Sequence, residues 1–140
     1  MQHTRTRTRS WANLRRSWSR PKSAPLLDEQ VELTPRGLVL ERCQFGWLET
    51  HERWALDWAE LRLVFAVKVD LWAWDEVRLV CLTREGEELS ISEEARGFRE
   101  LAASLPAHLP GARPWEAWYP QLSLAPGERA TPTVWERPRS

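Results

Sequence analysis

The feature that most constrains this chain is the change of hydrophobic period within residues 54–105. The first part of this segment alternates apolar and polar residues, which is typical of strands with one buried face. After Ser92 the apolar residues recur at steps of three and four, which is typical of an amphipathic helix. The pattern predicts a mostly β, β+α fold in which an antiparallel sheet is closed by one C-terminal amphipathic helix.

Turn signals divide the sheet-forming region into an antiparallel meander. The breakers Pro35 and Gly37 predict a hairpin between strands at 30–34 and 38–43. A short third strand is expected to end at a kink near Ala59. The strands that follow are expected to contain Leu61–Asp70, Val77–Leu82 and Leu89–Ile91.

The strand signal at 61–70 is the clearest in the chain, and it also predicts a buried face. The five odd-numbered positions of this segment are all apolar, so we expect that face to line the core; they are Leu61, Leu63, Phe65, Val67 and Val69. The next strand, 77–82, is apolar on both faces, which predicts a central position in the sheet.

The helix is predicted to begin after Ser92, which is a favourable N-cap, and to be stopped by Pro106 and by Pro110 and Gly111. Gly97 weakens a helix but suggests close approach to the sheet. A short second helix containing Trp115, Trp118 and Tyr119 is expected to cover a sheet edge.

Length and composition predict a single domain with flanking segments. The chain has 140 residues, of which 42% are hydrophobic and 29% charged, as in ordinary globular proteins. We expect a basic disordered arm at 1–27, a folded domain at 28–122, and a Pro-rich C-terminal tail at 123–140 in which Val134 and Trp135 could pack. No segment has the ~18 consecutive apolar residues that a membrane span needs.

The use of arginine and cysteine suggests a cytoplasmic bacterial protein. Arginine outnumbers lysine 18 to 2, which we interpret as the codon bias of a GC-rich bacterium. Cys43 and Cys81 form no paired motif, so two buried thiols in a reducing compartment are expected rather than a disulfide.

The amino-terminal arm is strongly basic. Residues 1–22 carry seven basic groups and no acid, and all 20 carboxylates follow from Asp28 onward. An arm without regular structure is the simplest interpretation. A short helix with Trp11, Leu14 and Trp18 on one face could instead lie on an anionic membrane surface or on nucleic acid. The candidate residues for that contact are Arg5, Arg7, Arg9, Arg15, Arg16, Arg20 and Lys22.

No sequence motif indicates catalysis, a cofactor or a metal. The chain contains no HExxH, G-x-S-x-G, Walker or dinucleotide-binding pattern. The acidic loop around Asp70 and Asp75 lacks the spacing and the glycine of a calcium loop. Cys43 and His51 could meet in space and form a small enzyme's site, but nothing local supports it. We therefore expect a protein that is not an enzyme and has no cofactor or metal.

The order of elements resembles a pleckstrin-homology-like domain, as in small bacterial proteins of that type. The resemblance covers about residues 31–120 and rests on core and turn positions: Trp58, Leu61, Lys68, Asp70, Asp75, Val77, Leu79, the run from Ser92 to Phe98, Leu105, Pro106 and Trp115. It implies a bent antiparallel half-barrel closed by a helix. Relatives that bind phosphoinositides use clustered basic residues after the first strand, whereas this loop offers only Arg36.

The loop between the two longest strands is the best candidate for a binding site. It carries two of the ten tryptophans, and exposed tryptophans at a hairpin tip make good protein-binding anchors. They could equally fold back over the open end of the barrel. The predicted contact patch, called the hairpin patch below, comprises Asp70, Trp72, Trp74 and Asp75. The expected function is binding of another protein, in an immunity or adaptor role.

Overall fold

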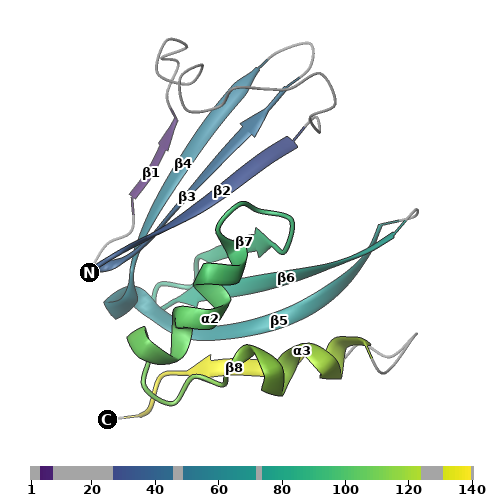
Figure 1. Cartoon of the computed structure of the whole chain (residues 1–140). Coiled ribbons are helices and arrows are strands. Elements are labelled where there is room, and N and C mark those ends of the chain that lie inside the picture. The colour runs from purple at the N-terminus through teal and green to yellow at the C-terminus, as the bar shows by residue number, and fades with distance from the viewer. Residues whose placement is uncertain (1–3, 8–26, 46–48, 72–73, 124–130, 140) are drawn as a thin grey trace.

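The computed structural model describes residues 4–7, 27–45, 49–71, 74–123 and 131–139. Within them it is mostly β, with two antiparallel four-stranded sheets and two α-helices (Figure 1). Sheet A has the order β1-β4-β3-β2 and sheet B has the order β7-β6-β5-β8. The two sheets meet at a corner and diverge from it (Figure 1).

Sheet A contains the predicted first hairpin. Its strands are β1 (Thr4–Arg7), β2 (Leu27–Thr34), β3 (Gly37–Gln44) and β4 (Thr50–Asp57). The β2–β3 turn follows the prediction from Pro35 and Gly37, and the Thr34 hydroxyl accepts a hydrogen bond from the Gly37 N–H at 3.0 Å. Gly37 is required there because a Cβ would lie 1.7 Å from the carbonyl oxygen of Leu56.

The corner between the sheets is the short 3-10 helix η1 (Trp58–Glu60), near the predicted kink. Asp57 caps it by accepting a hydrogen bond from the Ala59 N–H at 3.0 Å. Sheet B then consists of β5 (Leu61–Leu71), β6 (Trp74–Thr83), β7 (Glu88–Ser92) and β8 (Thr133–Glu136). As predicted, β6 is a central strand, since it pairs with both β5 and β7.

The predicted buried face of β5 is wrong beyond its first residue. A register irregularity between Leu61 and Leu63 exchanges the two faces, so Val64 and Ala66 are fully buried. Phe65 and Val67 are only half-buried. The other face carries Arg62 and Lys68 as well as Val64 and Ala66. The period shows which residues share a face, but it does not reveal a bulge that turns the less apolar face inward.

The main helix begins later than predicted, and of the two predicted stops it passes Pro106 but ends before Pro110. α2 spans Phe98–His108, because Gly97 adopts a left-handed conformation (φ 89°) and ends a series of turns after β7. Ser92 caps one of these turns, accepting from the Glu94 N–H at 3.0 Å, and not the helix. Pro106 lies inside the helix, whose last turn is closed by the Leu109 N–H bonded to the Leu105 carbonyl at 2.8 Å.

The closing helix is neither single nor last in the chain. α3 (Trp115–Ser123) confirms the predicted second helix, and β8 follows it. β8 lies in the segment expected to be a Pro-rich tail, where Val134 and Trp135 are buried. Arg137 then donates to the carbonyl of Leu61 at 2.7 Å, which ties the chain to the corner.

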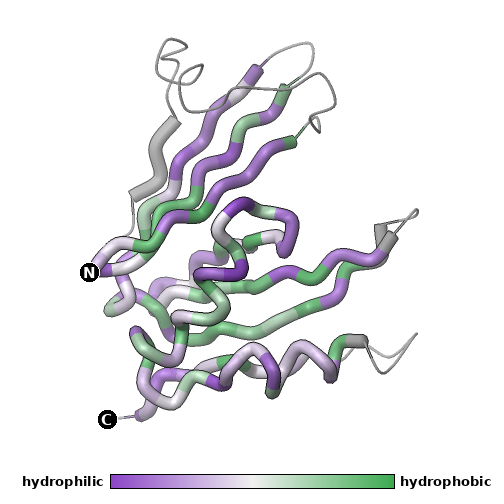
Figure 2. Tube along the Cα trace, viewed as in Figure 1, coloured by the Kyte–Doolittle hydropathy of each residue, from purple (hydrophilic) through white to green (hydrophobic). Residues whose placement is uncertain are grey.

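One apolar core joins the two sheets and the helices. Figure 2 shows apolar residues over most of β5 and over the ends of β2–β4 nearest η1. The core contains residues of both sheets, both helices and β8, and its fully buried members include Leu38, Leu40, Leu61, Val64, Leu79, Ile91, Phe98, Leu101, Trp118 and Val134. The loop before α2 crosses the edge of sheet A, where the Val31 N–H donates a hydrogen bond to the Arg96 carbonyl at 2.8 Å.

Candidate functional site

The hairpin formed by β5 and β6 carries the predicted hairpin patch at its far end. Asp70 faces Asp75 and Leu71 faces Trp74 in the register, as the last pairs before the turn. The side chain of Asp75 is 52% exposed and pairs with Lys68 at 3.1 Å (Nζ to Oδ2). Trp72 lies outside the described residues, as do the side chains of Asp70 and Trp74. The structure therefore places one member of the patch in detail.

A cleft of about 180 Å³ opens beside Asp75, and we call it the hairpin cleft. Its walls come from β5, β6, the segment after β7, and α3. The lining residues are Lys68, Asp75, Val77, Glu93, Tyr119 and Leu122. The cleft thus combines two carboxylates, one ammonium group and one phenol with two apolar side chains.

Glu93 is held firmly in the hairpin cleft. Its Oε1 accepts a hydrogen bond from the Val77 N–H at 2.9 Å, and its Oε2 accepts one from the Tyr119 hydroxyl at 3.0 Å. The Tyr119 ring stacks on Trp115 with 4.1 Å between ring centroids. Burial, and then the hydrogen bond to Glu93, raise the pKa of Tyr119, so the phenol stays protonated and donates.

Sequence reasoning missed Glu93 and Tyr119 as site residues. Glu93 directly follows Ser92, the predicted helix cap, and Tyr119 belongs to the short helix that was expected to cover a sheet edge. They meet because Glu93 continues the β6–β7 pairing by one residue, its N–H bonding to the Val77 carbonyl at 2.8 Å. No local motif signals a site formed by residues 77, 93 and 119, so only the tertiary fold reveals it.

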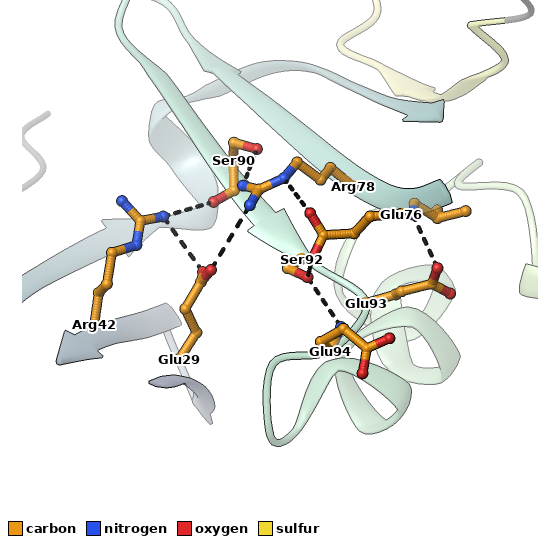
Figure 3. A network of polar contacts seen from close by, with 9 residues as sticks. Glu29, Arg42, Glu76, Arg78, Ser90, Ser92, Glu93 and Glu94 are labelled. Atoms are coloured by element: carbon orange, nitrogen blue, oxygen red, sulfur yellow. Dashed lines mark hydrogen bonds and ion pairs between the residues drawn. The ribbon is translucent and has the colours of Figure 1, made fainter. Parts of the chain in front are cut away.

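A second concentration of polar side chains lies between β2 and β3 of sheet A and β6 and β7 of sheet B (Figure 3). Glu29 of β2, 5% exposed, lies 3.3 Å from Arg42 of β3 and 3.9 Å from Arg78 of β6. Arg78 also pairs with Glu76 at 2.9 Å, and Glu76 accepts a hydrogen bond from the Ser92 hydroxyl. We call this group the inter-sheet cluster; it comprises Glu29, Arg42, Glu76, Arg78, Ser90 and Ser92.

The inter-sheet cluster is a structural tie. Both of its carboxylates are buried. Glu29 pairs with Arg42 of the neighbouring strand, and Glu76 pairs with Arg78 of its own strand, β6. The ion pair between Arg78 and Glu29, at 3.9 Å, is the one that joins the two sheets in this cluster. Arg42 additionally donates to the Ser90 carbonyl at 3.4 Å and lies 4.9 Å from the centre of the Trp54 ring. Because both carboxylates are already paired with arginines, the cluster has no uncompensated charge to offer a ligand.

Cys43 and His51 do face each other across β3 and β4, but their surroundings oppose nucleophilic chemistry. Burial raises the pKa of Cys43 to about 11, and the carboxylates of Glu49 and Asp28 add to the effect. A reactive cysteine needs the opposite shift, toward the thiolate. His51 lies 3.0 Å from Glu41 (Nε2 to Oε2). Both cysteines are buried free thiols, as predicted.

The predicted anion-binding residues lie mostly outside the described residues. β1 places Arg5 opposite Trp54 and Arg7 opposite Glu52 in the register of sheet A. This short strand lies where the sequence favoured an arm without regular structure. The rest of the set, outside the described residues, is Arg9, Arg15, Arg16, Arg20 and Lys22.

The described residues contain neither a metal-binding cluster nor a helix able to span a membrane. No group of three or more His, Cys, Asp or Glu side chains there is arranged to hold a metal ion. Neither α2 nor α3, the helices in that part of the chain, is long and apolar enough to cross a membrane.

Comparison with known proteins finds no match: no family model, no curated protein and no solved structure is significantly similar to this chain.

Proposed function

We propose that this chain is a non-enzymatic domain that binds another protein through the hairpin patch, Asp70, Trp72, Trp74 and Asp75. The observation that carries the proposal is the hairpin cleft of about 180 Å³ beside Asp75, at the base of the turn that bears the two tryptophans. A tip with large aromatic side chains next to a pocket of side-chain size is the usual composition of a protein-binding hot spot.

The charge distribution supports a partner with a basic surface. From Asp28 onward the chain has 20 carboxylates and 13 basic groups. An acidic surface accelerates encounter with a basic partner and discriminates against acidic ones. Such a surface suits an immunity or adaptor protein of the bacterial cytoplasm.

A pleckstrin-homology-like fold is part of the proposal. Its support is the meander of six strands from β2 to β7, bent at η1 and followed by α2. The β2–β3 loop offers one basic residue, Arg36, and its guanidinium is paired with Asp57 at 3.0 Å. This favours protein binding over phosphoinositide binding within such a fold.

Replacing Trp72 and Trp74 with alanine tests the proposal. We expect the double variant to lose most of the partner captured by wild type from a lysate of the source organism, measured by quantitative mass spectrometry. The reason is that truncating a hot-spot aromatic costs ~2 kcal/mol or more of binding free energy. The thermal unfolding midpoint should stay close to that of wild type.

The matched control is the Trp11→Ala/Trp18→Ala variant, which removes the same number of indoles from the arm. It should capture the partner normally. The proposal fails if the hairpin variant captures as much as wild type. It also fails if that variant loses its cooperative thermal transition, because the two indoles would then belong to the core.

An alternative function is binding of an anionic membrane or of nucleic acid through the arm. The observation favouring it is that residues 1–22 hold seven basic groups and no acid. Electrostatic binding of this kind weakens steeply with added salt. The candidates are Arg5, Arg7, Arg9, Arg15, Arg16, Arg20 and Lys22.

This alternative predicts that the chain binds phosphatidylserine-containing vesicles or duplex DNA at low salt, measured by co-sedimentation and by fluorescence anisotropy. Deleting residues 1–27 should abolish binding. Because that deletion also removes β1 from the edge of β4, a second variant replaces only Arg9, Arg15, Arg16, Arg20 and Lys22 with glutamine. Binding that survives in both variants, or that is absent from wild type, excludes the arm as the binding element.

A further inference from the structure

We propose that the hairpin cleft receives a single arginine or lysine side chain of the protein partner. This inference rests on the proposed protein-binding function and specifies the chemistry of its anchor. It follows from the size of the cleft, from the charges that line it and from the position of its apolar side chains.

The size of the hairpin cleft fits one side chain. Its volume is about 180 Å³. Pockets for drug-sized ligands and cofactors typically measure ~300–1,000 Å³. A protein partner commonly inserts one anchoring residue into a small pocket of this kind.

The charges in the cleft favour a cation. Lys68 and Asp75 neutralise each other, with 3.1 Å between Nζ and Oδ2. The described hydrogen bonds to Glu93 come from the neutral donors Val77 N–H and Tyr119 O–H. The lining therefore keeps one negative charge. Arg99 of α2 acts on Tyr119 electrostatically, but no ion pair between Arg99 and Glu93 is described.

If an apolar group of a partner filled the cleft, it would displace water from the carboxylate of Glu93 and offer no hydrogen bond or charge in return. Burial of a charge without such a partner is unfavourable. A basic group would instead pair with that carboxylate. The Tyr119 oxygen donates its proton to Glu93, so its lone pairs remain able to accept from a guanidinium or ammonium group.

The apolar lining fits the rest of such a side chain. Val77 and Leu122 lie in the same cleft as Glu93. Arginine and lysine carry an aliphatic stem that packs on apolar surface while the charged head meets a polar group. An anchor that enters with its head toward Glu93 can place its stem against these two residues.

The test uses N-acetyl-arginine amide as the probe and N-acetyl-citrulline amide, which has nearly the same shape and no charge, as the matched control. Binding to the full chain is followed by the ¹H–¹⁵N NMR shifts of the Val77, Glu93 and Tyr119 amides. We expect saturable shifts at millimolar arginine amide, and at least ~5-fold weaker binding of citrulline amide, because one charge-assisted pair is lost.

Two variants locate the binding site. Glu93→Gln keeps an acceptor for the Val77 N–H but removes the charge, and should weaken arginine-amide binding at least ~5-fold. The control is Glu94→Gln, which alters the exposed neighbouring carboxylate and should leave binding unchanged. The spectrum of each variant without probe reports whether it is folded.

The inference is overturned if citrulline amide binds as tightly as arginine amide, or if Glu93→Gln and Glu94→Gln behave alike. It is also overturned if arginine amide shifts none of the three amides. If the hairpin tryptophans are nevertheless required for partner capture, the proposed function stands and only the identity of the anchor is wrong. If arginine amide does not bind and the hairpin tryptophans are not required for partner capture, the proposed function fails as well.

Discussion

The variant Gly97→Ala is expected to lower the free energy of unfolding by ~3 kcal/mol or more. Gly97 has φ +89°, a conformation that costs a residue with a Cβ about 1–2 kcal/mol. In addition, a Cβ at this position would lie 2.1 Å from the carbonyl oxygen of Val31. That oxygen belongs to a strand whose neighbouring residues are fixed by sheet pairing, so the strand cannot move away cheaply.

The chain offers matched controls for this prediction. Gly86 and Gly111 have φ +88° and +89°, and a Cβ on either would meet nothing within 4 Å. Alanine at those positions should cost only the ~1–2 kcal/mol of the left-handed conformation. Urea unfolding monitored by tryptophan fluorescence gives all three values. If the three alanine variants lose equal stability, the loop before α2 does not press against β2 as described.

Close approach at Gly97 is a feature that the sequence could predict. A glycine beside an apolar helical stripe lowers helix stability, and this cost suggests that close packing requires a residue without a side chain at that position. The β2–β3 hairpin was predictable for a similar local reason, since Pro35 and Gly37 are turn residues between alternating segments. The central position of β6 followed from its two apolar faces. Each of these features is encoded by residues adjacent in the sequence.

The features that were predicted wrongly depend on distant contacts. The face of β5 that enters the core is selected by a bulge after Leu61, and the alternation of residues along the strand gives no local signal of that bulge. The start of α2 was placed at Ser92 because Ser92 is a good cap in isolation. Its hydroxyl is instead shared between the Glu94 N–H and Glu76 of β6, which lies in another strand.

The candidate site could likewise be predicted only in part, where its residues carry a local sequence signal. Asp75 was identified from the sequence because it flanks a tryptophan-bearing turn, and the structure places it on the hairpin cleft. Glu93 and Tyr119 were not identified, because they are 26 residues apart and meet only through the packing of α3 near β5. Neither has a neighbour in the sequence that distinguishes it from an ordinary surface residue.

The inter-sheet cluster leads to the second large expected effect. Replacing Arg78 with methionine should lower the free energy of unfolding by ~3–5 kcal/mol, because it leaves the buried carboxylate of Glu76 without its arginine, whereas Glu29 keeps Arg42. Arg78 lies 2.9 Å from Glu76 and 3.9 Å from Glu29, and these two side chains are only 9% and 5% exposed. Methionine preserves most of the aliphatic volume, so the loss reports mainly on charge.

Two further variants separate this effect from a general loss of arginine. Arg36→Met removes an ion pair to Asp57 in which the arginine is 86% exposed, and should cost only ~0–1 kcal/mol. Adding Glu76→Gln to Arg78→Met should restore part of the stability, because the buried charge that lost its partner is then gone. Urea unfolding of the four proteins, wild type included, gives the comparison. If Arg78→Met costs no more than Arg36→Met, or if Glu76→Gln adds its own loss to that of Arg78→Met, then Arg78 does not stabilise the fold by neutralising the buried carboxylate of Glu76.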